Sequence, residues 1–288
     1  MATTPDIMFH HLGLSIYNLP RTVFSVFGFG IYYYGLLIAI GIMLATLLTS
    51  YQARKTGQDP DAYVNFLVYA LFAAIIGGRL HFVMFSWDYY SHNPGQILNL
   101  RGGGIGFYGA ILSALAVFII YSRRKKLDTL LFLDTAMPTV LIGQALGRWG
   151  NFFNREAYGV FTNSFMAMSI RLEDVRGPVT EEMMNNLLIL GDTQYIQVHP
   201  TFLYESIWNI LAFCLISLYR PHQRFRGEVG LLYFTLYGFG RFFIEGLRAD
   251  QLLLWGTGLA ISQLISATLF LGSLTIIILF RHKAKLAA

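Results

Sequence analysis

Five polar or charged side chains fall within nine residues of the segment 147–159, which reads GRWGNFFNREAYG. They are Arg148, Asn151, Asn154, Arg155 and Glu156, and they follow a long apolar run. Ionisable groups at the end of a membrane helix are costly to place, so they are candidates for a functional site. The structural alternative is a helix-end turn whose long cationic side chains reach the membrane surface. This segment alone does not decide between the two.

A second polar group lies at helical spacing in the apolar segment 228–245. Tyr237, Arg241, Glu245 and Arg248 follow one another at steps of four, four and three residues, so they share one helix face. Such a face is costly against lipid and is expected to look into the bundle or a wet cavity. An ion-pair ladder between helices is the structural alternative. A ladder does not need two arginines for one glutamate, and the surplus positive charge favours an anionic ligand.

A third stretch, RGGGIGFYGA at 101–110, is rich in glycine. Its backbone could form a cradle for phosphate, whereas the structural alternative is close packing of membrane helices. The sequence has no GK[ST] motif, no CxxC or HExxH, no carboxylate cluster and no evident Ser-His-Asp set. We therefore expect no metal and no cofactor. If the protein is an enzyme, one of its substrates has to bring the nucleophile.

The composition of the chain predicts the class of protein to which these groups belong. Of 288 residues, 55% are hydrophobic and 13% are charged, and that charged share is about half the usual one in soluble domains. We expect an all-α integral membrane protein with seven transmembrane helices in a single membrane domain, 1–288. The predicted spans are 30–51, 63–85, 104–121, 128–147, 201–219, 228–245 and 258–280.

The distribution of basic residues predicts the orientation of these spans. Lysines and arginines gather in the loops after the first, third, fifth and seventh spans, and by the positive-inside rule those loops are cytoplasmic. The N-terminus is then outside and the C-terminus inside. The insertion at 150–200 becomes a small extracytoplasmic head, and the aromatic stretch 11–35 becomes an N-terminal arm at the membrane surface. The loop residues are Arg54, Lys55, Arg123, Arg124, Lys125, Lys126, Arg220, Arg224, Arg226, Arg281, Lys283 and Lys285.

Taken together, the motifs resemble those of the prolipoprotein diacylglyceryl transferase family. The matching segments, in the family's order, are YYYGL (32–36), GGRLHFVMF (77–85), GGGIGFYGA (102–110), GRWGNFFNREAYG (147–159), HPTFLYE (199–205) and YGFGRFFIEGLR (237–248). The resemblance implies seven helices with an extracytoplasmic head and arm in the bacterial cytoplasmic (inner) membrane. It also implies a central cavity that opens sideways to lipid.

The resemblance further implies the first step of bacterial lipoprotein maturation. The diacylglyceryl group of phosphatidylglycerol moves to the lipobox cysteine of a prolipoprotein signal peptide, a thioether forms, and glycerol phosphate leaves. The substrate cysteine is then the nucleophile that this chain lacks. Fixed cations would stabilise the departing phosphate and lower the pKa of the incoming thiol. The expected partners are phosphatidylglycerol, prolipoprotein signal peptides and membrane lipid, with no nucleic acid.

Carried over residue by residue, the family motifs assign catalytic roles to Arg148, Arg241 and Tyr108. Many members have a histidine, proposed as the base, where this chain has Tyr108. Because a free tyrosine has a pKa near ~10 and is a poor base at neutral pH, we expect Tyr108 to position lipid. His81 is an alternative base. The expected substrate-binding residues are Arg148, Asn151, Glu156, Gly159, Tyr34, Tyr237, Glu245, Arg248, Arg79 and His199.

Two other classes of function stay open. A transporter or channel could bind an anion at the same arginines, although the sequence has no evident inverted repeat or pair of broken helices. A scaffold or receptor without chemistry would leave the converging arginines and glutamates unexplained.

Overall fold

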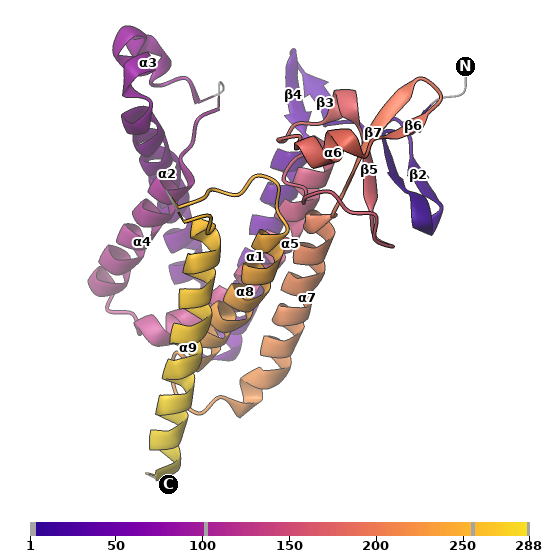
Figure 1. Ribbon diagram of the computed structural model, residues 1–288. Coiled ribbons are helices and arrows are strands. Elements are labelled where there is room, and N and C mark those ends of the chain that lie inside the picture. Colours follow the sequence, from indigo (N-terminus) through magenta and orange to yellow (C-terminus); the bar gives the residue numbers. More distant parts are fainter. Residues whose placement is uncertain (1–3, 101–102, 255–256, 287–288) are drawn as a thin grey trace. The chain divides into compact units, whose positions relative to one another are not determined.

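The computed structural model describes residues 4–100, 103–254 and 257–286 (Figure 1). The chain forms two compact units. One comprises Met1–Ala45 and Leu133–Ala288, and the other is Thr46–Phe132. Arg101 and Gly102, the first two residues of the glycine-rich motif, lie outside the described residues.

Most of the chain is helical, and six of the described helices are long and apolar enough to cross a membrane. The prediction of a mostly helical membrane protein is therefore confirmed. The six correspond to α1 (Tyr33–Lys55), α2 (Pro60–Phe85), α4 (Phe107–Arg124), α5 (Thr129–Asn154), α7 (Thr201–Tyr219, continued by the 3-10 turn Arg220–His222) and α9 (Ile261–Leu286, with the span at Ile261–Lys283).

Helix α8 (Glu228–Gly246) occupies the position of the predicted span 228–245, but it is not among the six. Glu228, Arg241 and Glu245 all lie in this helix, and their charges lower its mean hydropathy. It packs against α7 and α9. The charged residues that make α8 a candidate for the functional site are thus also the reason why it is less apolar than the six spans.

Two buried carboxylates fix the start of α8. Asp134 of α5 accepts hydrogen bonds from the backbone N–H groups of Gly227 (2.6 Å) and Gly230 (2.8 Å), so it satisfies donors that an α-helix leaves free at its first turn. Glu228 is fully buried and forms an ion pair with Arg281 of α9. These contacts fix the position of α8 along its own axis. They therefore also fix the height of Arg241 and Glu245, which lie further along the helix.

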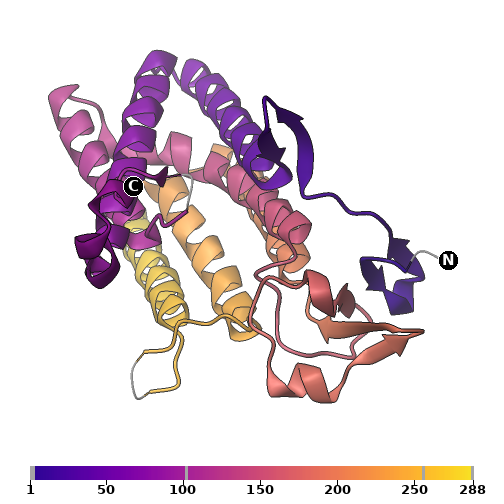
Figure 2. The same ribbon diagram turned by 90° about the horizontal axis from the view of Figure 1, so that it is seen from above.

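The insertion between α5 and α7 forms a sheet with the N-terminus of the chain. The strands run antiparallel in the order β2 (Leu14–Ile16), β1 (Ile7–Phe9), β5 (Met168–Arg171), β7 (Thr193–Val198) and β6 (Leu188–Leu190). Viewed from above, the indigo N-terminal strands lie beside the insertion (Figure 2). The head therefore contains a five-stranded sheet besides the short helices α6 (Glu181–Asn185), Leu172–Asp174 and His10–Leu12.

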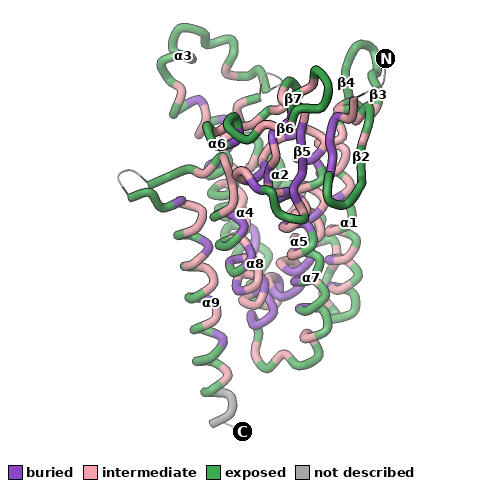
Figure 3. Tube along the Cα trace, turned by 45° about the vertical axis from the view of Figure 1, so that its right-hand side comes forward, coloured by how far each residue is buried: buried purple, intermediate pink, exposed green. Residues whose placement is uncertain are grey.

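Burial differs between this sheet and the long helices. Strands β1, β5 and β7 supply buried residues such as Ile7, Ile170 and Ile196 to one core, whereas most of α9 is exposed or half-buried (Figure 3). Exposed apolar helix faces of this extent are expected for segments surrounded by lipid.

A separate two-stranded hairpin, β3 (Thr22–Val26) and β4 (Phe29–Tyr32), leads directly into α1. Phe27 at its tip is 95% exposed. The stretch that the sequence predicts as an arm is thus divided. Its first residues complete the sheet of the head, and its later residues form this hairpin.

In the second unit, α2 packs along α4. Asp59 caps α2, where its side chain accepts a hydrogen bond from the N–H of Asp61 at 3.0 Å and Pro60 takes the first helical position. The short helices α3 (Trp87–His92) and Pro94–Gln96 follow α2 before the chain reaches α4.

Candidate active site

A buried carboxylate, Glu205 in the first turns of α7, connects the two arginine-bearing segments. Glu205 as a whole residue is only 3% exposed. One oxygen, Oε1, accepts a hydrogen bond from Nη2 of Arg148 on α5 at 2.7 Å, and Oε2 accepts one from Nη1 of Arg241 on α8 at 2.7 Å. The structure therefore brings Arg148 and Arg241 together around one carboxylate.

The charged network continues along α8 and into the turn that follows it. Arg241 also forms an ion pair with Glu245 at 2.5 Å, and Nε of Arg248 lies 3.8 Å from the same Glu245 oxygen. Arg248 makes two hydrogen bonds with the Asp250 carboxylate, at 2.9 and 2.7 Å. Burial alone would raise the pKa of Asp250, but the hydrogen bonds and charge of Arg248 lower it.

This network corrects the expectation of surplus positive charge. Arg148, Arg241 and Arg248 are matched in number by Glu205, Glu245 and Asp250. Tyr237, Arg241 and Glu245 lie on α8 at the predicted spacing, but Arg248 lies two residues beyond the end of this helix at Gly246. Glu205 and Asp250, which balance the arginines, also come from outside that helix face. The arginines are thus held in place by carboxylates, and an anion that enters must interact with an organised, nearly neutral network.

A smaller polar cluster at the end of α5 lies next to Arg148. The amides of Asn151 and Asn154 donate to Oε1 of Glu156 at 3.1 and 3.0 Å, and Nη1 of Arg148 donates to Oδ1 of Asn151 at 3.4 Å. The Arg148 side chain remains 22% exposed. Arg148 is therefore buried enough to be oriented and open enough to meet a ligand.

Arg155 belongs to a different cluster, although it lies in the same motif. Its backbone takes a left-handed conformation with φ of 57°. Its buried guanidinium donates to Asp6 at 3.0 Å and to the carbonyl of Leu19 at 2.7 Å. Asp6 also pairs with Arg171 at 2.9 Å. Arg155 thus ties the N-terminal strands to the end of α5, which supports the head.

Gly159 and His199 form a backbone crossing beside the network. The N–H of Gly159 donates to the carbonyl of His199 at 2.9 Å, and Val160 donates to Leu247 at 2.7 Å. Burial lowers the pKa of His199, whose Nδ1 lies 3.4 Å from the Tyr204 hydroxyl. A Cβ atom on Gly159 would lie 2.6 Å from Cβ of His199 and 2.7 Å from the Leu247 carbonyl. Only glycine fits this crossing.

Gly159→Ala is therefore expected to destabilise the protein by about 1–3 kcal/mol, the usual cost of overpacking a tight site. The matched control is Gly147→Ala on α5, where a Cβ atom meets nothing within 4 Å and alanine favours the helix. Thermal unfolding of both variants in the same detergent checks this. An unchanged midpoint for Gly159→Ala would contradict the close crossing.

Two tyrosines expected at the site also lie in the first unit. Tyr34 of α1 packs directly on Gly150 of α5, where a Cβ atom would come within 2.6 Å of the ring. Tyr237 stacks on Tyr233 of the same helix, with ring centres 5.8 Å apart and planes 5° from parallel. Tyr237 is one turn before Arg241 and thus lies directly beneath the arginine network.

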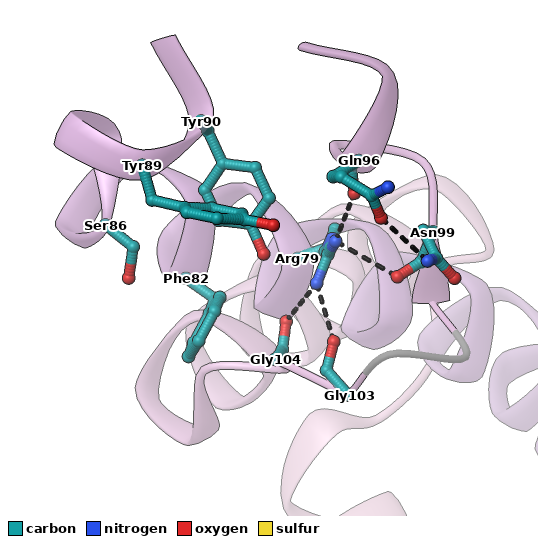
Figure 4. Close-up of a pocket in the computed structure, with 9 residues that line it drawn as sticks. All are labelled: Arg79, Phe82, Ser86, Tyr89, Tyr90, Gln96, Asn99, Gly103 and Gly104. Atoms are coloured by element: carbon teal, nitrogen blue, oxygen red, sulfur yellow. Dashed lines mark hydrogen bonds between the residues drawn. The ribbon is translucent and has the colours of Figure 1, made fainter. Parts of the chain in front are cut away.

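In the second unit, the Arg79 guanidinium is occupied by hydrogen bonds to backbone carbonyls. Its buried guanidinium donates to five carbonyls, those of Gln96, Ile97, Asn99, Gly103 and Gly104, at 2.6–3.1 Å. It also lies 5.2 Å from the centre of the Tyr90 ring. Figure 4 shows the bonds to Gln96, Asn99, Gly103 and Gly104. They lie beside a cavity of about 380 Å³ that Phe82, Ser86 and Tyr89 also line. In this arrangement Arg79 orders the loop between α2 and α4.

The glycines around α4 pack this helix closely against α2. The N–H of Gly106 donates to the carbonyl of Gly78 at 2.8 Å, and Cβ atoms on Gly106 or Gly109 would collide with His81. Nδ1 of His81 is buried and has no hydrogen-bond partner among the described residues. Tyr108, in the first turn of α4, is 36% exposed. In the part of the motif that the structure describes, close packing is the observed role of glycine.

Glu205 is the site residue that the sequence interpretation missed. It ends the motif HPTFLYE and is the only acidic residue in the segment 201–219. An ionisable residue inside an apolar span is a functional candidate by default, and this signal could have identified it. Over residues 4–100, 103–254 and 257–286, no group of three or more His, Cys, Asp or Glu side chains is placed to hold a metal ion.

Comparison with known proteins agrees with the motifs. The family model for prolipoprotein diacylglyceryl transferase matches residues 21–279. Three similar proteins, each named phosphatidylglycerol–prolipoprotein diacylglyceryl transferase, come from Finegoldia magna, Enterococcus faecalis and Limosilactobacillus reuteri. They are 37%, 40% and 39% identical, over 92%, 91% and 88% of this chain and 97%, 91% and 89% of their own lengths. The chain belongs to the prolipoprotein diacylglyceryl transferase family.

Proposed function

We propose that this protein transfers the diacylglyceryl group of phosphatidylglycerol to the cysteine thiol of a prolipoprotein signal peptide. The sulfur attacks the glycerol carbon that bears the phosphate. A C–S bond forms as the C–O bond breaks, and the electron pair leaves with the phosphate oxygen. The thiol proton balances the second negative charge of the released glycerol phosphate. The observation that carries this proposal is the pair of arginines held by Glu205, in a chain of this family.

Arg148 and Arg241 have different roles in this mechanism. Arg148 uses Nη2 on Glu205 and has an exposed part that can bind the phosphate of the lipid head group. The Arg241 side chain is 13% exposed and is held between Glu205 and Glu245, so its charge is fixed before the reaction begins. A fixed cation stabilises negative charge that develops on the leaving phosphate. The same field favours the thiolate of the incoming cysteine.

The remaining predicted residues shape this site. Asn151 and Glu156 orient Arg148. Glu245 holds Arg241 from the other side and also lies close to Arg248. Gly159 and His199 bring the end of the head close to the end of α8. Tyr34 and Tyr237 supply the walls next to Gly150 and Arg241. We assign Arg79 an indirect part in substrate binding, through the loop that it orders.

We further propose that α8 is a seventh membrane span, despite its charges. Glu205 on α7 pairs with Arg241, and Arg281 on α9 pairs with Glu228, as expected for ionisable residues that face a bundle interior. With seven spans, the basic loops are cytoplasmic and the head, the N-terminus and the site are extracytoplasmic. The protein then lies in the bacterial cytoplasmic membrane, and residues 1–288 form one membrane domain.

The direct test of the reaction uses the purified full-length protein, labelled phosphatidylglycerol and a lipobox peptide. Thioether-linked diacylglyceryl peptide, together with free glycerol phosphate, is the expected product. A transporter that binds anions at the same arginines would instead move solute across vesicles and make no thioether. The same peptide with serine in place of cysteine is the control, because it lacks the thiol.

Tyr108→Phe is expected to keep measurable transfer activity. A phenol hydroxyl is a poor base at neutral pH because a free tyrosine has a pKa near ~10, and the Tyr108 ring is partly exposed. The pH–rate profiles of the Phe variant and the wild type check the expectation. Tyr108→His is the matched variant. If Phe abolishes turnover and His restores it with a limb near the imidazole pKa, position 108 takes the proton.

A further inference from the structure

Two amide side chains in the first unit have buried polar atoms without partners. Asn209 on α7 is 0% exposed, and neither its Oδ1 nor its Nδ2 has a hydrogen-bond partner in the described chain. Oε1 of Gln144 on α5 is also buried without a partner. Nearly all buried polar groups in proteins are hydrogen-bonded to protein or to ordered water, so three such atoms require an explanation.

Helix register places the two amides at the same level. Helices α5 and α7 run antiparallel. At one level Arg148 meets Glu205 and Trp149 donates to Ser206 at 3.1 Å, and further along the pair Leu141 and Ala212 share an apolar core. Gln144 precedes Arg148 by four residues and Asn209 follows Glu205 by four. Both amides therefore lie one helical turn from the Arg148–Glu205 pair, between it and the apolar core.

Helix α8 provides the third side of this layer. Nε2 of Gln144 donates to the hydroxyl of buried Tyr233 at 3.1 Å, and the Tyr233 ring stacks on Tyr237. Reversing the Gln144 amide exchanges which of its atoms is bonded and which is not. On Asn209, however, one donor and one acceptor stay without partners in either orientation.

The mixture of donors and acceptors decides what can fill this layer. An anion would satisfy only donors, and a metal ion or an ester carbonyl would satisfy only one kind of atom. Water both donates and accepts, and it typically makes about three hydrogen bonds to buried groups of this kind. We propose that Gln144, Asn209 and Tyr233 bind internal water between α5, α7 and α8, one turn beneath the arginine–glutamate network.

This site is independent of the proposed reaction, because its argument uses only burial and hydrogen bonding. It has a consequence for the network above it. Bound water would link α5 to α7 one helical turn away from Glu205 and Arg148. The water layer would then help to hold these two helices at the separation that the ion pair requires.

The direct test is an experimental structure of the full-length wild-type protein in lipid, at a resolution that shows water. Density within hydrogen-bond distance of both the Asn209 and Gln144 amides is the expected result. A direct hydrogen bond between the two amides, or a layer without water density between them, would overturn the proposal. Because this measurement uses the wild type, it stands even if substitutions here prevent folding.

A thermodynamic cycle provides the second test. Asn209→Leu and Gln144→Leu should each lower the unfolding midpoint, because each leaves water and the opposite amide with fewer partners. The double variant should unfold no earlier than the less stable single variant, since it removes the whole polar layer. A higher midpoint for Asn209→Leu alone, or strictly additive losses, would show that the amides share no ligand.

Discussion

Arg148→Ala is expected to lower the rate of diacylglyceryl transfer by about 100- to 1,000-fold, because the lipid phosphate would no longer be held where Arg241 can stabilise its developing charge. It should also weaken phosphatidylglycerol binding, because Arg148 is the partly exposed guanidinium of the network. Its removal leaves Glu205 paired with Arg241 alone. Initial rates and lipid binding, measured on folded protein, separate the two effects.

Arg148→Lys should restore little of this activity. Arg148 holds Glu205 with one terminal nitrogen and Asn151 with the other, and the compact ammonium of lysine cannot reproduce that fork. Arg176→Ala, which removes an exposed arginine of the head, is the control for a general loss of positive charge. Near-normal turnover of the Lys variant would mean that charge alone, without the fork, binds the lipid.

Glu205→Gln is expected to destabilise the protein by about 3–5 kcal/mol, the cost of breaking a buried ion pair from one side. Two arginines would lose the carboxylate between them while their side chains stay 22% and 13% exposed. Glutamine keeps the size of the side chain, so the loss reports charge rather than packing. Unfolding by heat or denaturant in a fixed detergent measures it.

The matched control for Glu205 is Glu181→Gln, which neutralises an exposed glutamate of the head and should be nearly neutral in stability. Glu205→Asp should lie between Gln and wild type, because it keeps the charge but shortens the reach to Arg148 and Arg241. If Glu205→Gln unfolds like wild type but loses activity, the carboxylate acts on the substrate rather than on the helices.

Local patterns in the sequence predicted one side of the site. The steps between Tyr237, Arg241, Glu245 and Arg248 predict a shared helix face because helical spacing is a local property. The pairing of Arg241 with Glu245 follows from that spacing. Glu205 is different, because nothing near it in sequence shows that two arginines on other helices meet it. A single glutamate in an apolar segment forms no repeating pattern from which its contacts could be predicted.

The head shows the same limit. The sequence predicted a small head at 150–200, but one neighbour of β5 in the sheet is β1, from the N-terminus of the chain. The hydrophobic pattern of a strand can set its register, but it does not identify a partner strand so far away in the sequence. Arg155 is a further case, since its left-handed backbone turns it toward Asp6 while Glu156 beside it joins the site.

The sheet of the head imposes an order on biogenesis. Asp6 and its strand β1 are synthesised first, but Arg155, which binds Asp6, follows 149 positions later, and β5 follows after that. At translation rates of roughly 5–20 residues per second, the pair of strands β1 and β2 waits about 7–30 seconds for these partners. During that time one edge of β1 has no neighbouring strand, and an open edge is a site for mispairing. The nascent head is therefore exposed to aggregation until four membrane helices have been made.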